Sequence, residues 1–201
     1  MIINLTSKDT KHIALIHSTA LEGDFLPSLG FNFLNTFYSG VILKDGVYGF
    51  GFEDKGKVVG FVLGTRDSVD FFSLALKSKL LKLSFFLCLQ IIKNPLIVKN
   101  VLETFFYTSK DKGPKAELIV IAVKQNYQGK GIGKKLTQAL EGEFVKNNIP
   151  EYKLTVHADK AAVQFYEHLK YSKISSFNLY DKLWYVYSKK IKGYGKTSKR
   201  K

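Results

Sequence analysis

The stretch Gln128–Lys135, QGKGIGKK, places three glycines and three lysines within eight residues. Glycine permits positive φ and lets a ligand approach the backbone closely. The first turn of a following helix offers free N–H groups and a positive dipole end to an anion. We therefore interpret this stretch as a loop that binds a pyrophosphate group.

Two common phosphate-binding motifs do not fit the spacing of this loop. A P-loop would need glycine at the position of Gln128 and serine or threonine at that of Lys135. A dinucleotide-binding motif would need a further glycine where the chain has Lys134 or Leu136. The spacing that remains is Q-x-x-G-x-G, between an apolar stretch and an amphipathic one.

This motif, Gln128–Gly133, resembles the acetyl-CoA loop of the GNAT superfamily of acyl-CoA N-acyltransferases. A second signature of the family, N-x-x-A-x-x-F/L-Y-E, is similar to Asp159–Glu167, with Asp159 where Asn is usual. The resemblance covers Lys44–Gly64 and Pro114–Lys189. It implies an α/β fold (α+β, mixed sheet) in which helices flank a central, mostly antiparallel sheet. It also implies transfer of an acetyl group from acetyl-CoA to a primary amine. The basic charge of the chain favours an anionic acceptor, such as an amino sugar or another small anionic amine.

Hydrophobic periodicity predicts the secondary structure along the chain. Amphipathic spacing predicts helices, and β-rich or near-continuous apolar runs predict strands. In chain order we expect helices at Lys8–Leu21 and Phe25–Phe37, strands at Val47–Glu53, Lys57–Gly64 and Ala116–Val123, a helix at Ile132–Phe144, a strand at Glu151–Ala158, a helix at Lys160–His168 and a strand at Leu183–Lys189.

The segment Asp70–Asp111 is an addition to this pattern. Its sequence predicts two helices that are separated at Asn94-Pro95. Proline cannot donate a backbone hydrogen bond, and it disfavours a helical conformation of the residue before it. Its longest apolar run, Leu83–Ile92, is too short to cross a bilayer, which takes about 20 residues. A helical lid is our first interpretation; a homodimer surface and a hairpin resting on an anionic membrane surface stay open.

Composition predicts one globular domain. The chain has 201 residues and 45% hydrophobic content, so we expect a single domain over residues 1–189, with a helical insertion at about 70–111 and a basic tail at 190–201. The formal charge of +14 favours anionic partners. A lone Cys88 excludes an internal disulfide, the N-terminus lacks a signal-peptide pattern, and the histidines lack metal-ligand spacing. We expect a cytoplasmic protein without a metal.

The resemblance also implies which residues hold acetyl-CoA. Backbone amides of the loop would bind the pyrophosphate, with lysine side chains adding charge. The end of the preceding strand would hold the pantetheine arm and, at Val123, polarise the thioester carbonyl. The second signature would lie beside the arm. The residues are Ile121, Ala122, Val123, Gln128, Gly129, Lys130, Gly131, Ile132, Gly133, Lys134, Asp159 and Ala162.

Two catalytic roles follow. The resemblance makes Tyr166 the donor of a proton to the CoA thiolate, although a tyrosine here is also a common core residue. It makes Glu117 a candidate general base that acts through water; strict strand alternation would place Glu117 on the same face as Ile121 and Val123. His157 or water alone remain alternatives for the base.

Other functions stay open at this point. The acceptor could be a protein or peptide amine instead of a small molecule. The chain could also be a non-catalytic module that keeps a CoA-binding fold and associates with an anionic membrane surface or nucleic acid. The lysine-rich C-terminal residues are consistent with that alternative, whereas Tyr166 and the intact loop argue for an enzyme.

Overall fold

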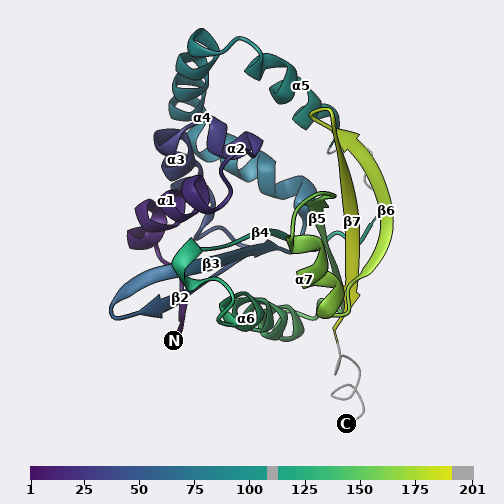
Figure 1. Cartoon of the computed structure of the whole chain (residues 1–201). Helices are drawn as coiled ribbons and strands as arrows, with labels where there is room; N and C mark the ends of the chain where they lie inside the picture. Colours follow the sequence, from purple (N-terminus) through teal and green to yellow (C-terminus); the bar gives the residue numbers. More distant parts are fainter. Residues whose placement is uncertain (108–112, 192–201) are drawn as a thin grey trace.

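The computed structural model describes residues 1–107 and 113–191 and forms one seven-stranded sheet with helices on both faces (Figure 1). The strand order is β1-β2-β3-β4-β5-β7-β6, and all neighbours are antiparallel except β4 and β5. The elements are β1 Ile2–Asn4, α1 Thr10–Ala20, α2 Phe25–Ser28, α3 Phe31–Val41, β2 Val47–Asp54, β3 Lys57–Thr65, α4 Ser68–Lys93, α5 Ile97–Tyr107, β4 Glu117–Val123, α6 Ile132–Lys146, β5 Glu151–His157, α7 Ala162–His168, β6 Ser172–Leu179 and β7 Lys182–Lys190.

Two apolar clusters fill the two faces of the sheet. On one face, α1, α3 and α4 bury Ile13, Leu34 and Leu83 against Phe61 of β3. On the other face, α6 buries a helical stripe that includes Leu136, Leu140 and Phe144. The 3.6-residue spacing of these side chains directs each helix onto the sheet.

The second predicted helix is divided in the structure. Gly30 has φ 86°, a left-handed conformation that glycine adopts easily, and it separates α2 from α3. The strands β1 and β6 were not predicted. β6 is an edge strand whose side chains are mostly exposed, so the alternation that identifies a strand is weak there.

The additional segment forms α4 and α5, separated at Asn94-Pro95 as the sequence predicts. α4 contains a non-helical residue, Lys79, with φ −139° and ψ 26°, which marks a kink. The predicted end of the insertion at Asp111, and most of the basic tail, lie outside the described residues. No helix in the described ranges meets the length and hydropathy needed to cross a membrane.

Candidate active site

The site begins where β4 and β5 diverge. These parallel strands pair at one register position, Glu117 with Lys153, and from there to Val123 the β5-facing edge of β4 has no strand partner. A cavity of about 1400 Å³ extends along this edge. Unpaired strand N–H and C=O groups can bind an extended ligand arm in the way a strand would.

The glycine loop lies at the open end of this gap. Gly129 and Gly131 have φ 72° and 74°, and a Cβ on either would meet nothing within 4 Å. Gly131 is the N-cap of α6, and no side chain caps the helix. The side chain of Gln128 donates a hydrogen bond to the carbonyl oxygen of Val123 at 2.9 Å, which fixes the loop to the end of β4. The first amides of α6 are thus available to an anion.

Most of the predicted binding residues line one cavity. Those that do are Ile121, Ala122, Val123, Gln128, Gly129, Gly131, Ile132, Gly133, Lys134 and Ala162, together with Glu117 and Tyr166. Lys130 and Asp159 do not line it. The Lys130 ammonium lies 5.0 Å from the ring centroid of Tyr127, and the Asp159 side chain is 79% exposed.

A β-bulge changes the face on which Glu117 lies. Val120 pairs with Leu63 and Leu118 pairs with Gly64, which leaves Ile119 as an extra residue in β4. The expectation that Glu117 shares a face with Ile121 and Val123 is therefore wrong, because an extra residue shifts the alternation by one. Glu117 lies instead on the face covered by α1 and α3.

Glu117 meets a buried lysine across the start of the gap. The Lys153 ammonium lies 3.8 Å from a Glu117 carboxylate oxygen, with side-chain exposures of 3% and 13%. Both residues line the cavity. A charged pair this well buried depends on each partner, because either charge alone would be costly in this surrounding.

Tyr166 projects from α7 into the other side of the gap. It is 5% exposed, and its ring contacts those of Phe165 and Tyr171. No described residue provides a hydrogen-bond partner for its hydroxyl. Burial raises the pKa of Tyr166 above that of an ordinary tyrosine, so the hydroxyl keeps its proton at neutral pH.

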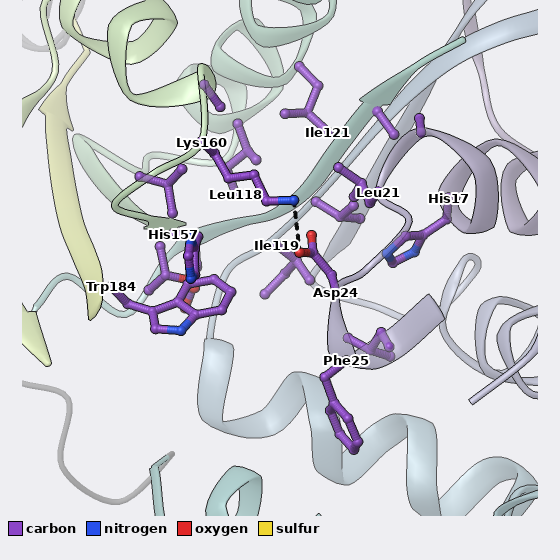
Figure 2. Close-up of a pocket in the computed structure, with 18 of the residues that line it drawn as sticks. His17, Leu21, Asp24, Phe25, Leu118, Ile119, Ile121, His157, Lys160 and Trp184 are labelled. Carbon is purple, nitrogen blue, oxygen red and sulfur yellow. Dashed lines mark ion pairs between the residues drawn. The ribbon is translucent and has the colours of Figure 1, made fainter. Parts of the chain in front are cut away.

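His157 ends β5 inside the same cavity (Figure 2). The residue is 5% exposed, and its ring meets Trp184 edge to face at 5.3 Å. A carboxylate oxygen of Asp159 lies 2.5 Å from Nδ1 but outside hydrogen-bonding geometry, and neither ring nitrogen makes a hydrogen bond among the described residues. The ring can therefore accept or donate a bond to a ligand, which keeps His157 open as a base.

Ion pairs and aromatic contacts close the cavity on the side of α2. The Lys160 ammonium lies 3.1 Å from a carboxylate oxygen of Asp24. Figure 2 shows this ion pair across the cavity. The ring of Phe25 lies 4.9 Å from that of Tyr180, which is in the turn between β6 and β7. This end of the cavity is thus bounded by contacts between segments far apart in sequence.

Helix α5 contacts the same turn between β6 and β7 through polar interactions. Glu103 accepts a hydrogen bond from the amide of Tyr180 at 2.6 Å, and Lys99 pairs with Asp181. Both turn residues have positive φ, at 55° and 57°, where glycine or asparagine is usual in a two-residue hairpin turn. Strained backbone of this kind persists where surrounding contacts fix it.

Several of these residues carry no recognisable motif in the sequence. Asp24, Lys160 and Tyr180 belong to no motif, and Trp184 is the only tryptophan in a strand otherwise typical of a core. Lys153 occupies a polar position in the alternating stretch Glu151–His157, where an exposed side chain is expected, so its burial carries no signal in the sequence. Across residues 1–107 and 113–191, no group of three or more His, Cys, Asp or Glu is placed to share a metal ion.

A buried histidine and tyrosine form the floor of the cavity near α1. Nδ1 of His17 and the hydroxyl of Tyr38 are hydrogen-bonded, and both residues line the cavity. Burial lowers the pKa of His17 to about 4 and raises that of Tyr38 well above its ordinary value. The His17 ring is therefore neutral at physiological pH.

We expect the free energy of unfolding to fall as the pH is lowered through the range from 6.5 to about 4. The unfolded chain takes up a proton at His17 in this range while the folded chain does not, so acid favours unfolding. The loss from this residue between about pH 7 and about pH 4.5 should be about 2–3 kcal/mol. Urea unfolding of the wild type and His17→Gln at both pH values measures it. An equal pH dependence in both proteins would contradict the assignment.

The family comparison agrees with this geometry. Residues 107–199 match a family model described as an acetyltransferase (GNAT) domain. No curated protein is similar enough in sequence to count as a relative.

Solved structures share the fold along nearly the whole chain. The ribosomal-protein-S18-alanine N-acetyltransferase from Escherichia coli is 18% identical, with a TM-score of 0.61, over 98% of this chain and 97% of that one. The ribosomal-protein-alanine N-acetyltransferase from Brucella melitensis is 15% identical, with a TM-score of 0.63, over 94% and 99%. PaiA N-acetyltransferase from Thermoplasma acidophilum, in complex with coenzyme A, is 14% identical, with a TM-score of 0.59, over 94% and 98%. At these identities the likeness shows the fold alone.

Proposed function

We propose that this chain, whose residues 107–199 match a GNAT acetyltransferase domain, is an acyl-CoA-dependent N-acetyltransferase that acetylates a primary amine on a small molecule. The donor is acetyl-CoA, and the transfer is direct, within a ternary complex. The observation that carries the proposal is the gap between β4 and β5 beside an uncapped helix start. A gap with free strand edges suits a pantetheine arm, and free helix amides suit its pyrophosphate.

The cosubstrate would be held by residues already described. The amides from Gly131 to Lys134 face the pyrophosphate, and exposed lysines of the loop add positive charge. The backbone of Ile121–Val123 borders the arm and the thioester carbonyl. Bound acetyl-CoA supplies the acyl group; this chain orients it. Asp159 stays a weaker prediction for this role, because it does not line the cavity.

The chemical step needs one proton donor and one acceptor. The amine nitrogen attacks the thioester carbonyl carbon, and the C–S bond breaks with its electron pair leaving on sulfur. Tyr166 donates its hydroxyl proton to that sulfur. Glu117, through water, or His157 takes the proton that the amine loses. Support for Glu117 is its place on the face covered by α1 and α3, where the cavity continues beyond β4.

A small acceptor is favoured by the closed end of the cavity. Phe25 contacts Tyr180, and α5 is hydrogen-bonded to the same turn. These contacts connect the two sides of the cavity, and an extended peptide would have to pass between those sides. The residues that line this end are mostly apolar, including Leu21, Leu87 and Trp184. An amine on an apolar body fits this lining better than the anionic amino sugar considered from charge alone.

A screen for thiol release tests the proposal. The purified full chain would be incubated with acetyl-CoA and a panel of aralkyl amines, aliphatic amines, amino sugars, sugar phosphates and peptides with free N-termini, and free CoA would be measured. Release that depends on a small amine, with the acetylated amine found by mass spectrometry, supports it. Release with peptides alone would favour a protein substrate. Binding of acetyl-CoA without release for any amine would favour a non-catalytic module.

We also propose the domain organisation and compartment expected from the sequence. Both apolar clusters lie on one sheet, which supports a single domain over residues 1–189 with the insertion at about 70–111 and the tail at 190–201. A lone exposed cysteine, Cys88, is consistent with a cytoplasmic protein.

Replacing Gly131 by valine is expected to abolish stabilisation by acetyl-CoA. A Cβ there meets no atom, but φ 74° is unfavourable for valine by about 1–2 kcal/mol, so the loop must change conformation. Ligand binding raises the melting temperature by mass action, and the variant should lose that increase.

Gly56→Val is the matched control for this change. Gly56 has φ 73° and equally open surroundings, but it lies in the hairpin turn between β2 and β3, away from the cavity. It should lose a similar amount of stability and keep the full response to acetyl-CoA. The loop assignment fails if Gly131→Val responds like Gly56→Val.

A further inference from the structure

The second half of α4 exposes apolar side chains along one side. We define the outer stripe as Leu81, Phe85, Cys88, Leu89 and Ile92, which follow one another at helical spacing. Leu81 is 86% exposed, Phe85 59% and Ile92 78%. Leu96, in the link to α5, continues the exposure at 77%.

The opposite side of the same helix is used for packing. Leu83 is 2% exposed, and Phe86, Leu87 and Ile91 pack against the core on that face of the sheet. This part of α4 is therefore apolar on both sides, which is typical of a helix with a partner on each side. The core accounts for one side only, so the outer stripe indicates a further partner.

The position of the stripe leaves it accessible to a flat surface. Figure 1 shows the corner between α4 and α5 at the edge of the molecule opposite α6. Val98 and Leu102 of α5 are also exposed, at 39% and 52%. Apolar side chains thus continue on both sides of the corner.

The charged residues of this part of α4 are all positive. Lys82 lies seven residues before Leu89, and Lys93 lies four residues after it. Both lysines are exposed, and this helical spacing places them on the same side of α4 as Leu89. The sequence from Leu80 to Lys93 contains no Asp or Glu. The formal charge of the whole chain is +14.

This charge decides between two occupants. A second copy of the chain would bring its own lysines and its own +14 to the contact, which repels at ordinary ionic strength. A bilayer surface containing anionic lipid offers an apolar layer and negative headgroups together. Lysine side chains beside an apolar stripe can extend to such headgroups while the stripe enters the interface.

We propose that the outer stripe docks on an anionic lipid bilayer. The helix lies in the interface with Leu81, Phe85 and Ile92 below the headgroups and Lys82 and Lys93 among them. The described helices are unsuited to crossing a membrane, so the contact is peripheral. This inference does not depend on the acceptor or on catalysis.

Cosedimentation of the full chain with vesicles tests the proposal. The vesicles would be phosphatidylcholine alone, or phosphatidylcholine with about one-third phosphatidylserine. The wild type should bind the anionic vesicles, and Leu81→Gln with Ile92→Gln should weaken that binding about tenfold or more, because two apolar side chains no longer enter the interface. Both residues are exposed, so the double variant should fold; circular dichroism and thermal melting check that it does.

The matched control changes exposed leucines elsewhere. Leu43 is 69% exposed and Leu183 43% exposed, and neither lies on α4 or α5. Leu43→Gln with Leu183→Gln should bind the vesicles as the wild type does. Higher salt should weaken wild-type binding through the lysine contribution.

Three results would overturn the proposal. The first is no binding of the wild type to anionic vesicles. The second is equal binding by the wild type and the stripe variant, which would assign the attraction to basic residues elsewhere. The third is a concentration-dependent dimer in sedimentation equilibrium that the stripe variant loses, which would make a second copy the occupant. Thiol release measured without vesicles should be the same in all variants, so this test fails or succeeds separately from the proposed function.

Discussion

Tyr166→Phe is expected to lower kcat on the identified amine by about 10²–10⁴-fold, the usual contribution of a positioned acid. The change removes one hydroxyl and little volume. Because no described residue bonds to that hydroxyl, folding and affinity for acetyl-CoA should be nearly unchanged. Steady-state kinetics of CoA release, with acetyl-CoA binding measured separately, gives both quantities.

Tyr171→Phe is the control for this change. Its ring contacts that of Tyr166, but its hydroxyl bonds to Tyr152, and it does not line the cavity. It should cost stability and leave kcat within about threefold of the wild type. If Tyr166→Phe also stays within about threefold, a difference of about 0.65 kcal/mol, water protonates the thiolate and Tyr166 is a packing residue.

Lys153→Met should lower the free energy of unfolding by about 3–5 kcal/mol, because it removes the ammonium group that faces the buried carboxylate of Glu117. Urea denaturation measures the change. Lys146→Met is the control: Lys146 pairs with Glu143 at 3.0 Å but is 73% exposed, so its loss should cost at most about 1 kcal/mol.

The double variant Lys153→Met, Glu117→Gln separates the pair from the packing. Removing the second charge should recover part of the stability lost with Lys153 alone. If the double variant is no more stable than Lys153→Met, the lysine acts through its contacts and not through the charge of Glu117. The same proteins in the amine assay show whether loss of the Glu117 carboxylate also lowers kcat.

The sequence determined the parts of the site that rest on local pattern. The loop Gln128–Gly133 was predicted from spacing, because positive φ at Gly129 and Gly131 and the start of α6 are properties of adjacent residues. The near-continuous apolar run of β4 and the helical period of α6 were equally clear. The break at Asn94-Pro95 followed from proline chemistry.

Edge elements were less predictable. β6 pairs with β7 along one side and exposes most of its side chains, so its residues carry little hydrophobic alternation. Its place in the sheet depends on hydrogen bonds to a partner strand. A backbone pairing of this kind leaves almost no mark on the residue types.

Only the tertiary structure decided the face of Glu117, its partner Lys153 and the closed end of the cavity. One extra residue at Ile119 reverses the alternation, and that bulge arises from pairing with β3, far back in the sequence. Lys153 reaches Glu117, and α5 reaches Tyr180, only once distant segments pack together. The exposure of the outer stripe was decided in the same way. Sequence period shows that a helix is apolar, whereas tertiary packing determines which of its sides is covered.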